Sequence, residues 1–289
     1  MEYQRGDRVL LTSRPEYGPG QVLEDNNGGN VSVFFVNVGV KKYGPEAELE
    51  LLQGDQAKHP VLDNLYVDKD GKVTQKYRKM EDLVARFLEL FPEGYDTPKY
   101  LGEERDYKVA ANKSFREKLG KVELDQLIEA GDFEEIKKRS LSVISKTNLV
   151  FPNETMALKD GLADEKVQEQ FGRALHGILY GDGELKARVE SFIEALFSAN
   201  APKWTLLTYF LFIGQPDRYI FLKPTASKQA TEVFGYNMLY QSELNWQTFK
   251  AHQDFAEYLF DLLFEMGPPL RPKDMIDVQG FVYCVSDLY

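Results

Sequence analysis

The sequence predicts an α+β protein in which a small β-rich module precedes a larger, mainly helical domain. The first fifty residues alternate short β-prone runs with turns rich in glycine and asparagine. From residue 81 onward, apolar residues recur at helical spacing, and a polar stretch separates the two regions. We therefore expect a small β-barrel over residues 1–56, a linker with short strands over 57–80, and a helical domain over 81–289.

The first predicted strand of the module covers Arg8–Leu11, and Tyr17–Gly20 ends this run before residues 21–23 resume it. Asp25–Asn30 is rich in Asn and Gly, which tolerate the positive φ of tight hairpin turns. In the next run, residues 31–36, every second residue is a large apolar one. This alternation predicts a barrel strand with one fully buried face.

The module resembles the Tudor-like, SH3-like domain at the C-terminus of UvrD/PcrA-type DNA helicases. The residues that carry the resemblance are Gly6–Val9, Tyr17–Gly20 and Val38–Lys42, within about the first fifth of the chain. The resemblance implies a small barrel that docks on RNA polymerase, on a helicase or on nucleic acid. We expect its protein-binding residues to be Arg8, Tyr17, Lys41, Lys42 and Tyr43.

Two departures from the helicases limit this expectation. No Walker-type glycine loop follows the module, so the resemblance does not imply unwinding activity. Residues 1–58 hold six Lys or Arg against nine acidic residues, whereas a phosphate-binding module needs positive charge. Protein docking is therefore a better interpretation of the module than DNA binding.

The composition indicates a soluble cytoplasmic protein. The chain has 289 residues, 43% of them hydrophobic and 28% charged, with a net charge of −11. This charge argues against a protein that coats nucleic acid or an anionic membrane. The apolar run Leu206–Ile213 is too short to span a membrane, and the polar start lacks a signal peptide. A single cysteine, Cys284, excludes an internal disulfide and a cysteine metal site and is expected to be a buried hydrophobe.

Helical periodicity dominates the rest of the chain. Leu83, Phe87 and Phe91 share one face of a helix that Pro92–Gly94 ends. Further helices are expected over residues 98–119, from residue 124, and around three later apolar stripes: 133–144, 171–179 and 189–197.

A local positive island occurs in this acidic chain, between residues 203 and 228. Four basic residues stand there against one acidic residue, Asp217, and large aromatic residues are interleaved with them. Such a pattern suits nucleic acid, because aromatic rings stack on bases and basic groups bind phosphates. The alternative is that the aromatic residues belong to the core and that Arg218 pairs with an acidic group such as Asp217. The candidate nucleic-acid-binding residues are Lys203, Trp204, Tyr209, Arg218, Tyr219, Lys223 and Lys228.

Asp274, Asp277 and Gln279 form a polar edge near the C-terminus. As a functional group, this edge would line a pocket beside Arg218 and Lys223. As a structural group, Asp274 would cap a short closing helix, because its carboxylate accepts the backbone N–H groups two or three residues later. We favour the cap and keep all three as pocket candidates.

Signals for catalysis are weak. A nuclease of the Asp…Glu-x-Lys class would use Asp132 with Glu135–Lys137, or Asp182 with Glu184–Lys186, but each aspartate stands too near its triplet. The three histidines, His59, His176 and His252, fall in no zinc-binding pattern. We therefore expect no catalytic residue, no metal and no cofactor.

The sequence thus favours a non-enzymatic adaptor of a bacterial DNA or RNA transaction, in transcription, repair or phage defence. In this interpretation the barrel docks a protein such as RNA polymerase or a helicase, and the positive island contacts nucleic acid or a second partner. The alternatives are a metal-dependent nuclease of a defence system and a structural subunit without nucleic acid. The C-terminal region also resembles uncharacterised bacterial proteins, through the stretches PDRYIFLKP and RPKDMIDVQGFVYCV.

Overall fold

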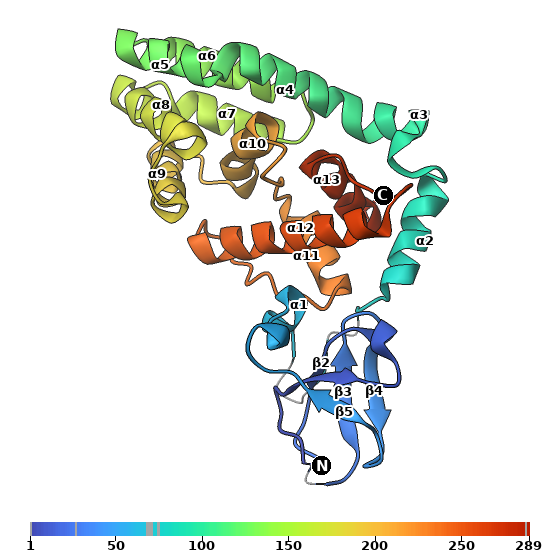
Figure 1. Ribbon diagram of the computed structural model, residues 1–289. Helices are drawn as coiled ribbons and strands as arrows, with labels where there is room; N and C mark the ends of the chain where they lie inside the picture. Colours follow the sequence, from blue (N-terminus) through green and yellow to red (C-terminus); the bar gives the residue numbers. More distant parts are fainter. Residues whose placement is uncertain (1, 27, 68–71, 74–75, 287) are drawn as a thin grey trace.

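The protein folds into an N-terminal antiparallel sheet and a larger assembly of helices (Figure 1). The computed structural model describes residues 2–26, 28–67, 72–73, 76–286 and 288–289. The predicted α+β class is confirmed.

Five short strands make up the sheet, in the order β4-β3-β2-β1-β5 with every neighbouring pair antiparallel. In the described residues the sheet is open, since no pairing joins β4 to β5. Among the described residues, the strands therefore do not close into the barrel that the sequence predicts. The strands are β1 (Arg8–Leu11), β2 (Gly20–Val22), β3 (Val31–Phe35), β4 (Gly39–Tyr43) and β5 (Leu49–Leu51).

Both faces of β3 are buried, whereas the alternating pattern predicted only one. Val31, Val33 and Phe35 join the sheet's own small apolar core. Phe34 points to the opposite face, where its ring lies 5.0 Å from that of Tyr77, and it belongs to the core of the helical part. The sheet is thus fixed to the helices by a side chain on the face of β3 that the alternation did not predict to be buried.

Residues between the sheet and the first long helix run along the helical part. They contain the 3-10 turn η2 (Gly54–Ala57) and the short helix α1 (Pro60–Asp63). The Tyr66 amide donates to the Gly235 carbonyl at 3.0 Å, and the Arg78 amide donates to the Val233 carbonyl at 2.8 Å. Where the sequence predicts short strands in the linker, an isolated bridge pairs Val67 with Val73, and residues 68–71 lie outside the described residues.

The remainder of the chain is helical, as predicted. In chain order the elements are α2 (Met80–Leu90), η3 (Gly94–Asp96), α3 (Pro98–Tyr100), the π-helical turn η4 (Leu101–Arg105), α4 (Asp106–Leu119), α5 (Lys121–Ala130), α6 (Phe133–Ile144), α7 (Pro152–Gly161), α8 (Glu165–Tyr180), α9 (Leu185–Ser198), α10 (Trp204–Gly214), α11 (Pro224–Val233), α12 (Trp246–Met266) and α13 (Met275–Val285).

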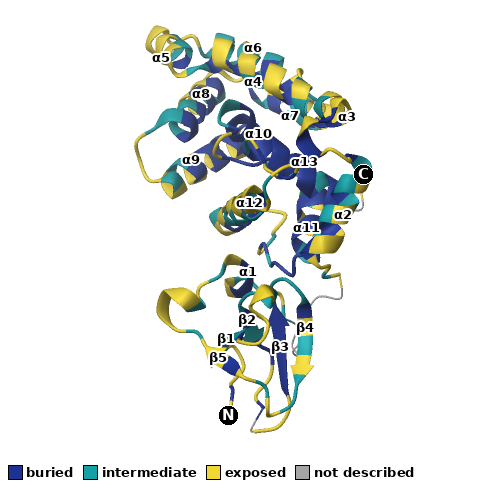
Figure 2. Ribbon diagram, turned by 45° about the vertical axis from the view of Figure 1, so that its right-hand side comes forward, coloured by how far each residue is buried: buried dark blue, intermediate teal, exposed yellow. Residues whose placement is uncertain are grey.

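Helix α10 lies at the centre of the helical part. Its residues 204–213 are all buried, so it is apolar on every side. Figure 2 shows α10 and α13 as mostly buried and the outer faces of α4, α5 and α6 as exposed. No helix among the described residues combines the length and the apolar character that crossing a membrane requires.

Helix α12 is the element of the helical part that lies above α1 and the sheet (Figure 1). It begins where the Asn245 side chain accepts a hydrogen bond from the Thr248 amide at 2.8 Å, which is an N-cap. Phe255, Leu259 and Leu263 on one face are buried in the core. The opposite face of this helix is therefore available to form a surface at the junction with the sheet.

Candidate functional site

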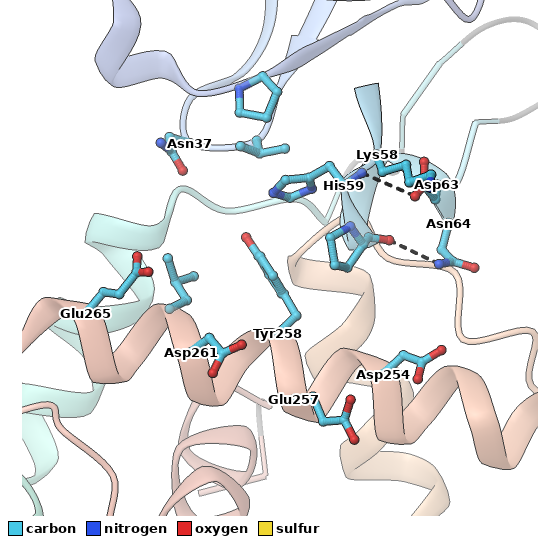
Figure 3. Close-up of a pocket in the computed structure, with 14 residues that line it drawn as sticks. Asn37, Lys58, His59, Asp63, Asn64, Asp254, Glu257, Tyr258, Asp261 and Glu265 are labelled. Atoms are coloured by element: carbon cyan, nitrogen blue, oxygen red, sulfur yellow. Dashed lines mark hydrogen bonds between the residues drawn. The ribbon is translucent and has the colours of Figure 1, made fainter. Parts of the chain in front are cut away.

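A groove of about 730 Å³ lies at the junction of the sheet and α12 (Figure 3). Its upper side is built by Pro19, Val36 and Asn37 from the sheet, together with residues 58–64 of the linker. The lower side is α12. Sites between two structural units are frequent binding places because side chains from separate elements converge there.

The α12 side of the groove is a row of carboxylates: Asp254, Glu257, Asp261 and Glu265. Their spacing of three, four and four residues places them on one face of the helix. Asp254 forms an ion pair with Lys250. Within the part of the chain that the structure describes, the other three make no ion pair. We call these four residues the acidic wall.

Burial and repulsion within the acidic wall disfavour the ionised form of Glu257. Partial burial raises the pKa of Glu257, and the neighbouring carboxylates of Asp254 and Asp261 add to this effect. Both causes disfavour the ionised form. A cation bound in the groove would relieve the repulsion, so the wall favours positively charged ligands.

The linker side of the groove adds little positive charge. The ring of His59 packs edge-on against Tyr258, with centroids 5.2 Å apart, and Figure 3 shows Tyr258 rising from α12 toward it. The His59 Nδ1 accepts a hydrogen bond from the Val61 amide at 3.2 Å. Burial lowers the pKa of His59 to about 4, so this histidine is neutral at pH 7.

The two charged residues on the linker side of the groove, Asp63 and Lys58, already have ion-pair partners. Asp63 binds the Arg8 guanidinium at 3.0 Å, and Lys58 binds Asp55 at 2.8 Å. The groove therefore carries an excess of negative charge contributed by the acidic wall.

The five predicted protein-binding residues do not form one surface. Tyr17 and Tyr43 lie on either side of Phe35, with ring centroids 5.8 and 6.1 Å from it. Lys41 pairs with Val33, and Lys42 pairs with Ser32, so the two lysines point to opposite faces of the sheet. Arg8 points toward the linker, where it binds Asp63 beside the groove.

The aromatic residues of the positive island are part of the core. Trp204, Tyr209 and Tyr219 are at most 5% exposed, so their rings offer no face for stacking on a base. The expected pairing of Arg218 with Asp217 is not among the observed ion pairs, and Arg218 lies over the Tyr219 ring instead.

Two of the three remaining cations of the island also lie over aromatic rings. Lys228 lies 4.8 Å from the Tyr240 centroid, and Lys223 contacts the rings of Phe151 and Tyr283. Lys203 precedes α10. Contact of these basic groups with nucleic acid stays a prediction, and it would have to occur without the stacking first expected.

Asp274 caps α13, as predicted, because its Oδ1 accepts a hydrogen bond from the Ile276 amide at 2.9 Å. Both Asp274 and the fully buried Asp277 bind Arg105, each at 2.8 Å. Tyr100 donates to Asp277 at 2.9 Å. Burial raises the pKa of Asp277, while the charge of Arg105 opposes this shift. The two carboxylates thus face Arg105, which the sequence did not single out, and only Gln279 lines a cavity together with Lys223.

The residues tested for nuclease chemistry have structural roles. Asp132 caps α6 by accepting from the Glu135 amide at 3.0 Å, and Glu135 binds Arg139. Lys137 binds Glu134. In the second triplet, Lys186 approaches Glu190 at 3.9 Å.

The histidines and the cysteine are likewise separate. His176 binds Asp125 at 2.6 Å, and His252 is buried in α12. Burial raises the pKa of the Cys284 thiol far above its usual value, which opposes nucleophilic use. Within the described ranges, no three His, Cys, Asp or Glu side chains are arranged to hold a metal ion.

Comparisons of the chain with protein-family models, with characterised proteins and with solved structures found no match. Sequence reasoning missed the acidic wall itself. Its signal was present in the sequence as acidic residues at positions 254, 257, 261 and 265, a helical spacing in a segment already expected to be helical.

Proposed function

We propose that the protein is a non-enzymatic adaptor that holds a basic, extended segment of a partner protein in the groove. The observation that carries this proposal is the acidic wall, three of whose carboxylates form no ion pair with any residue that the structure describes. A lysine- or arginine-rich segment would supply the missing charges. Electrostatic complementarity of this kind gives specificity and fast association.

The spacing of the acidic wall favours an extended segment. Glu257, Asp261 and Glu265 follow one another at four-residue steps, which is about 6 Å along a helix. In an extended chain, residues two apart lie on the same side at about 6.6 Å. Basic residues at alternate positions would therefore meet successive carboxylates, and about five residues would span the wall.

The partner that we propose belongs to a bacterial DNA or RNA transaction in the cytoplasm, such as RNA polymerase or a helicase. This part of the proposal rests on the resemblance of the N-terminal module to Tudor-like helicase domains. The meander β1-β2-β3-β4, with β5 returning to pair with β1, supports an SH3-like barrel. The groove adds a docking surface that uses both the module and α12.

A labelled peptide of seven residues, with lysine alternating with serine, tests the proposal by fluorescence anisotropy. The chain should bind it at low salt and should not bind a peptide in which glutamate replaces lysine. Asp261→Asn with Glu265→Gln should weaken binding about 2- to 30-fold, because each exposed charge pair contributes about 0.2–1 kcal/mol. The matched control is Glu190→Gln with Glu194→Gln, two exposed acidic residues four apart on α9.

Equal weakening by both double variants would overturn the groove as the binding site, because only the net charge would then matter. Failure of the lysine peptide to bind at 50 mM salt would overturn the class of partner. A labelled single-stranded DNA serves as a second probe. Tighter binding of the DNA than of the peptide, reduced by Arg218→Glu with Lys223→Glu, would favour the positive island as the principal site instead.

A further inference from the structure

A second, smaller cavity of about 110 Å³ lies inside the helical part, away from the groove. It is enclosed by the π-helical turn η4 and the start of α4, by the segment around Phe221, and by α13. Single π-helical turns are rare and occur frequently at functional sites. Here the turn places two consecutive carboxylates, Glu103 and Glu104, at the cavity.

Gln279 gives this cavity a polar group without a partner. Its side chain is 4% exposed, and its Oε1 accepts no hydrogen bond from the described residues. Buried acceptors in native proteins are nearly always hydrogen-bonded. On the same helix, two residues earlier, Asp277 accepts from Tyr100 and Arg105. The unpartnered oxygen of Gln279 therefore points to a ligand that donates a hydrogen bond.

A buried ion pair lines the same cavity. Lys108 is 2% exposed, and its Nζ lies 2.9 Å from Glu104 Oε2. An ammonium group has three donors, and Glu104 accepts one of them. Burial lowers the pKa of Lys108. Buried ion pairs are costly unless further hydrogen bonds satisfy both groups. The remaining donors of Lys108 are therefore a second set of polar groups in the cavity that a ligand could satisfy.

Opposite charges line the cavity in equal number. Lys223 adds a second cation, held 5.6 Å from the centroid of the Tyr283 ring. Glu103 adds a second anion and accepts from the Tyr289 hydroxyl at 2.7 Å. A ligand with a single charge would be attracted by one pair of like-charged side chains and repelled by the other pair. A ligand that carries both charges would meet a partner for each.

We propose that this cavity binds a small zwitterion of the size of a short-chain free amino acid. Its ammonium group would donate to Gln279 Oε1 and to Glu104, and its carboxylate would accept from Lys108 and Lys223. The volume of the cavity is the share that about four water molecules occupy in the liquid. This volume limits the ligand to a short side chain. The site is independent of the groove and of its partner.

Thermal unfolding and isothermal titration calorimetry with glycine, alanine and serine test this inference. A zwitterion at ten times its dissociation constant should raise the melting temperature by about 2 °C for a chain of this size. Ethylamine carries the cation alone, acetate the anion alone, and glycerol neither. At equal concentration these three should give smaller shifts than the amino acids.

Gln279→Leu should abolish the shift in melting temperature, because it replaces the unpartnered acceptor by an apolar side chain of similar size. Ser140→Ala is the matched control, since Ser140 Oγ is also buried without a hydrogen-bond partner among the described residues but does not line the cavity. This control should retain the shift. If Gln279→Leu does not fold, Lys223→Gln at the mouth of the cavity should weaken amino acid binding several-fold.

Two results would overturn the inference. One is a shift with amino acids no larger than the shifts with acetate and ethylamine. The other is a full shift in a folded Gln279→Leu or Lys223→Gln variant.

Discussion

The buried face of α12, opposite the acidic wall, contains a histidine that makes the stability of the protein depend on pH. His252 is 1% exposed, and its Nδ1 has no hydrogen-bond partner among the described residues. Burial lowers the pKa of His252 from its ordinary value of 6.5 to about 3. The folded protein therefore keeps this imidazole neutral at pH values where the unfolded chain protonates it.

The sign of the effect follows from the direction of the shift. Because the folded pKa lies below the unfolded one, the unfolded chain binds more protons, and stability falls as the pH falls from about 6.5 toward 3. A pH of 5 lies about 1.5 units below the pKa of the histidine in the unfolded chain. Protonation of the unfolded chain therefore lowers the unfolding free energy by about 2 kcal/mol at this pH. At pH 8 the loss is absent.

Replacing His252 by leucine isolates this contribution. Urea denaturation at pH 8 and pH 5 gives the unfolding free energy of each protein. From pH 8 to pH 5, the unfolding free energy of His252→Leu should fall by about 2 kcal/mol less than that of the wild type. Phe249→Leu, on the same buried face, controls for packing changes and should differ from the wild type equally at both. A pH-independent difference for His252→Leu would refute the assignment of a buried neutral imidazole.

Four further variants test how the fold is held together, each by urea denaturation. Phe34→Ala, at the contact of the sheet with the helices, should cost about 3–5 kcal/mol; a loss below 1 kcal/mol would contradict that contact. Asp277→Asn should cost about 3–5 kcal/mol because it leaves the charge of Arg105 partly uncompensated in the interior, whereas an unchanged midpoint would show that the pair is dispensable. Gly161→Ala should destabilise the fold because the new Cβ would lie 1.7 Å from a backbone carbonyl. Gly177→Ala, at a helical site where a new Cβ would meet no atom of another element within 4 Å, should stabilise the fold by about 1 kcal/mol. Equal effects of the two variants would contradict the close approach at Gly161.

Local signals in the sequence were sufficient for several of the strands and helices and for the cap of the last helix. The Asn- and Gly-rich stretch Asp25–Asn30 precedes β3, as hairpin chemistry requires. Asp274 stands immediately before α13 and accepts from a backbone amide two residues later. In both cases the interacting groups are a few residues apart, so their chemistry is legible in a short window of sequence.

Contacts between distant residues had no such signal. Arg105 binds Asp274, which is 169 residues later, and no local pattern joins them. Phe34 lies on the strand face for which the alternation predicted no burial, and Tyr77 covers it from a different segment. The burial of the aromatic residues of the positive island had no local signal either, since composition cannot distinguish aromatic residues that stack on a ligand from those that fill a core.

The acidic wall illustrates how a local pattern gains functional meaning from distant segments. On an isolated helix, four carboxylates at this spacing would be an ordinary solvated face. The linker places the neutral His59 against Tyr258, and the sheet side contributes Val36 and Asn37, so Glu257, Asp261 and Glu265 face a groove in which no ion pair with a described residue compensates them. Field lines concentrate in such clefts and strengthen attraction to a cationic ligand. The binding that we propose therefore depends on the junction, and a free α12 peptide would not reproduce it.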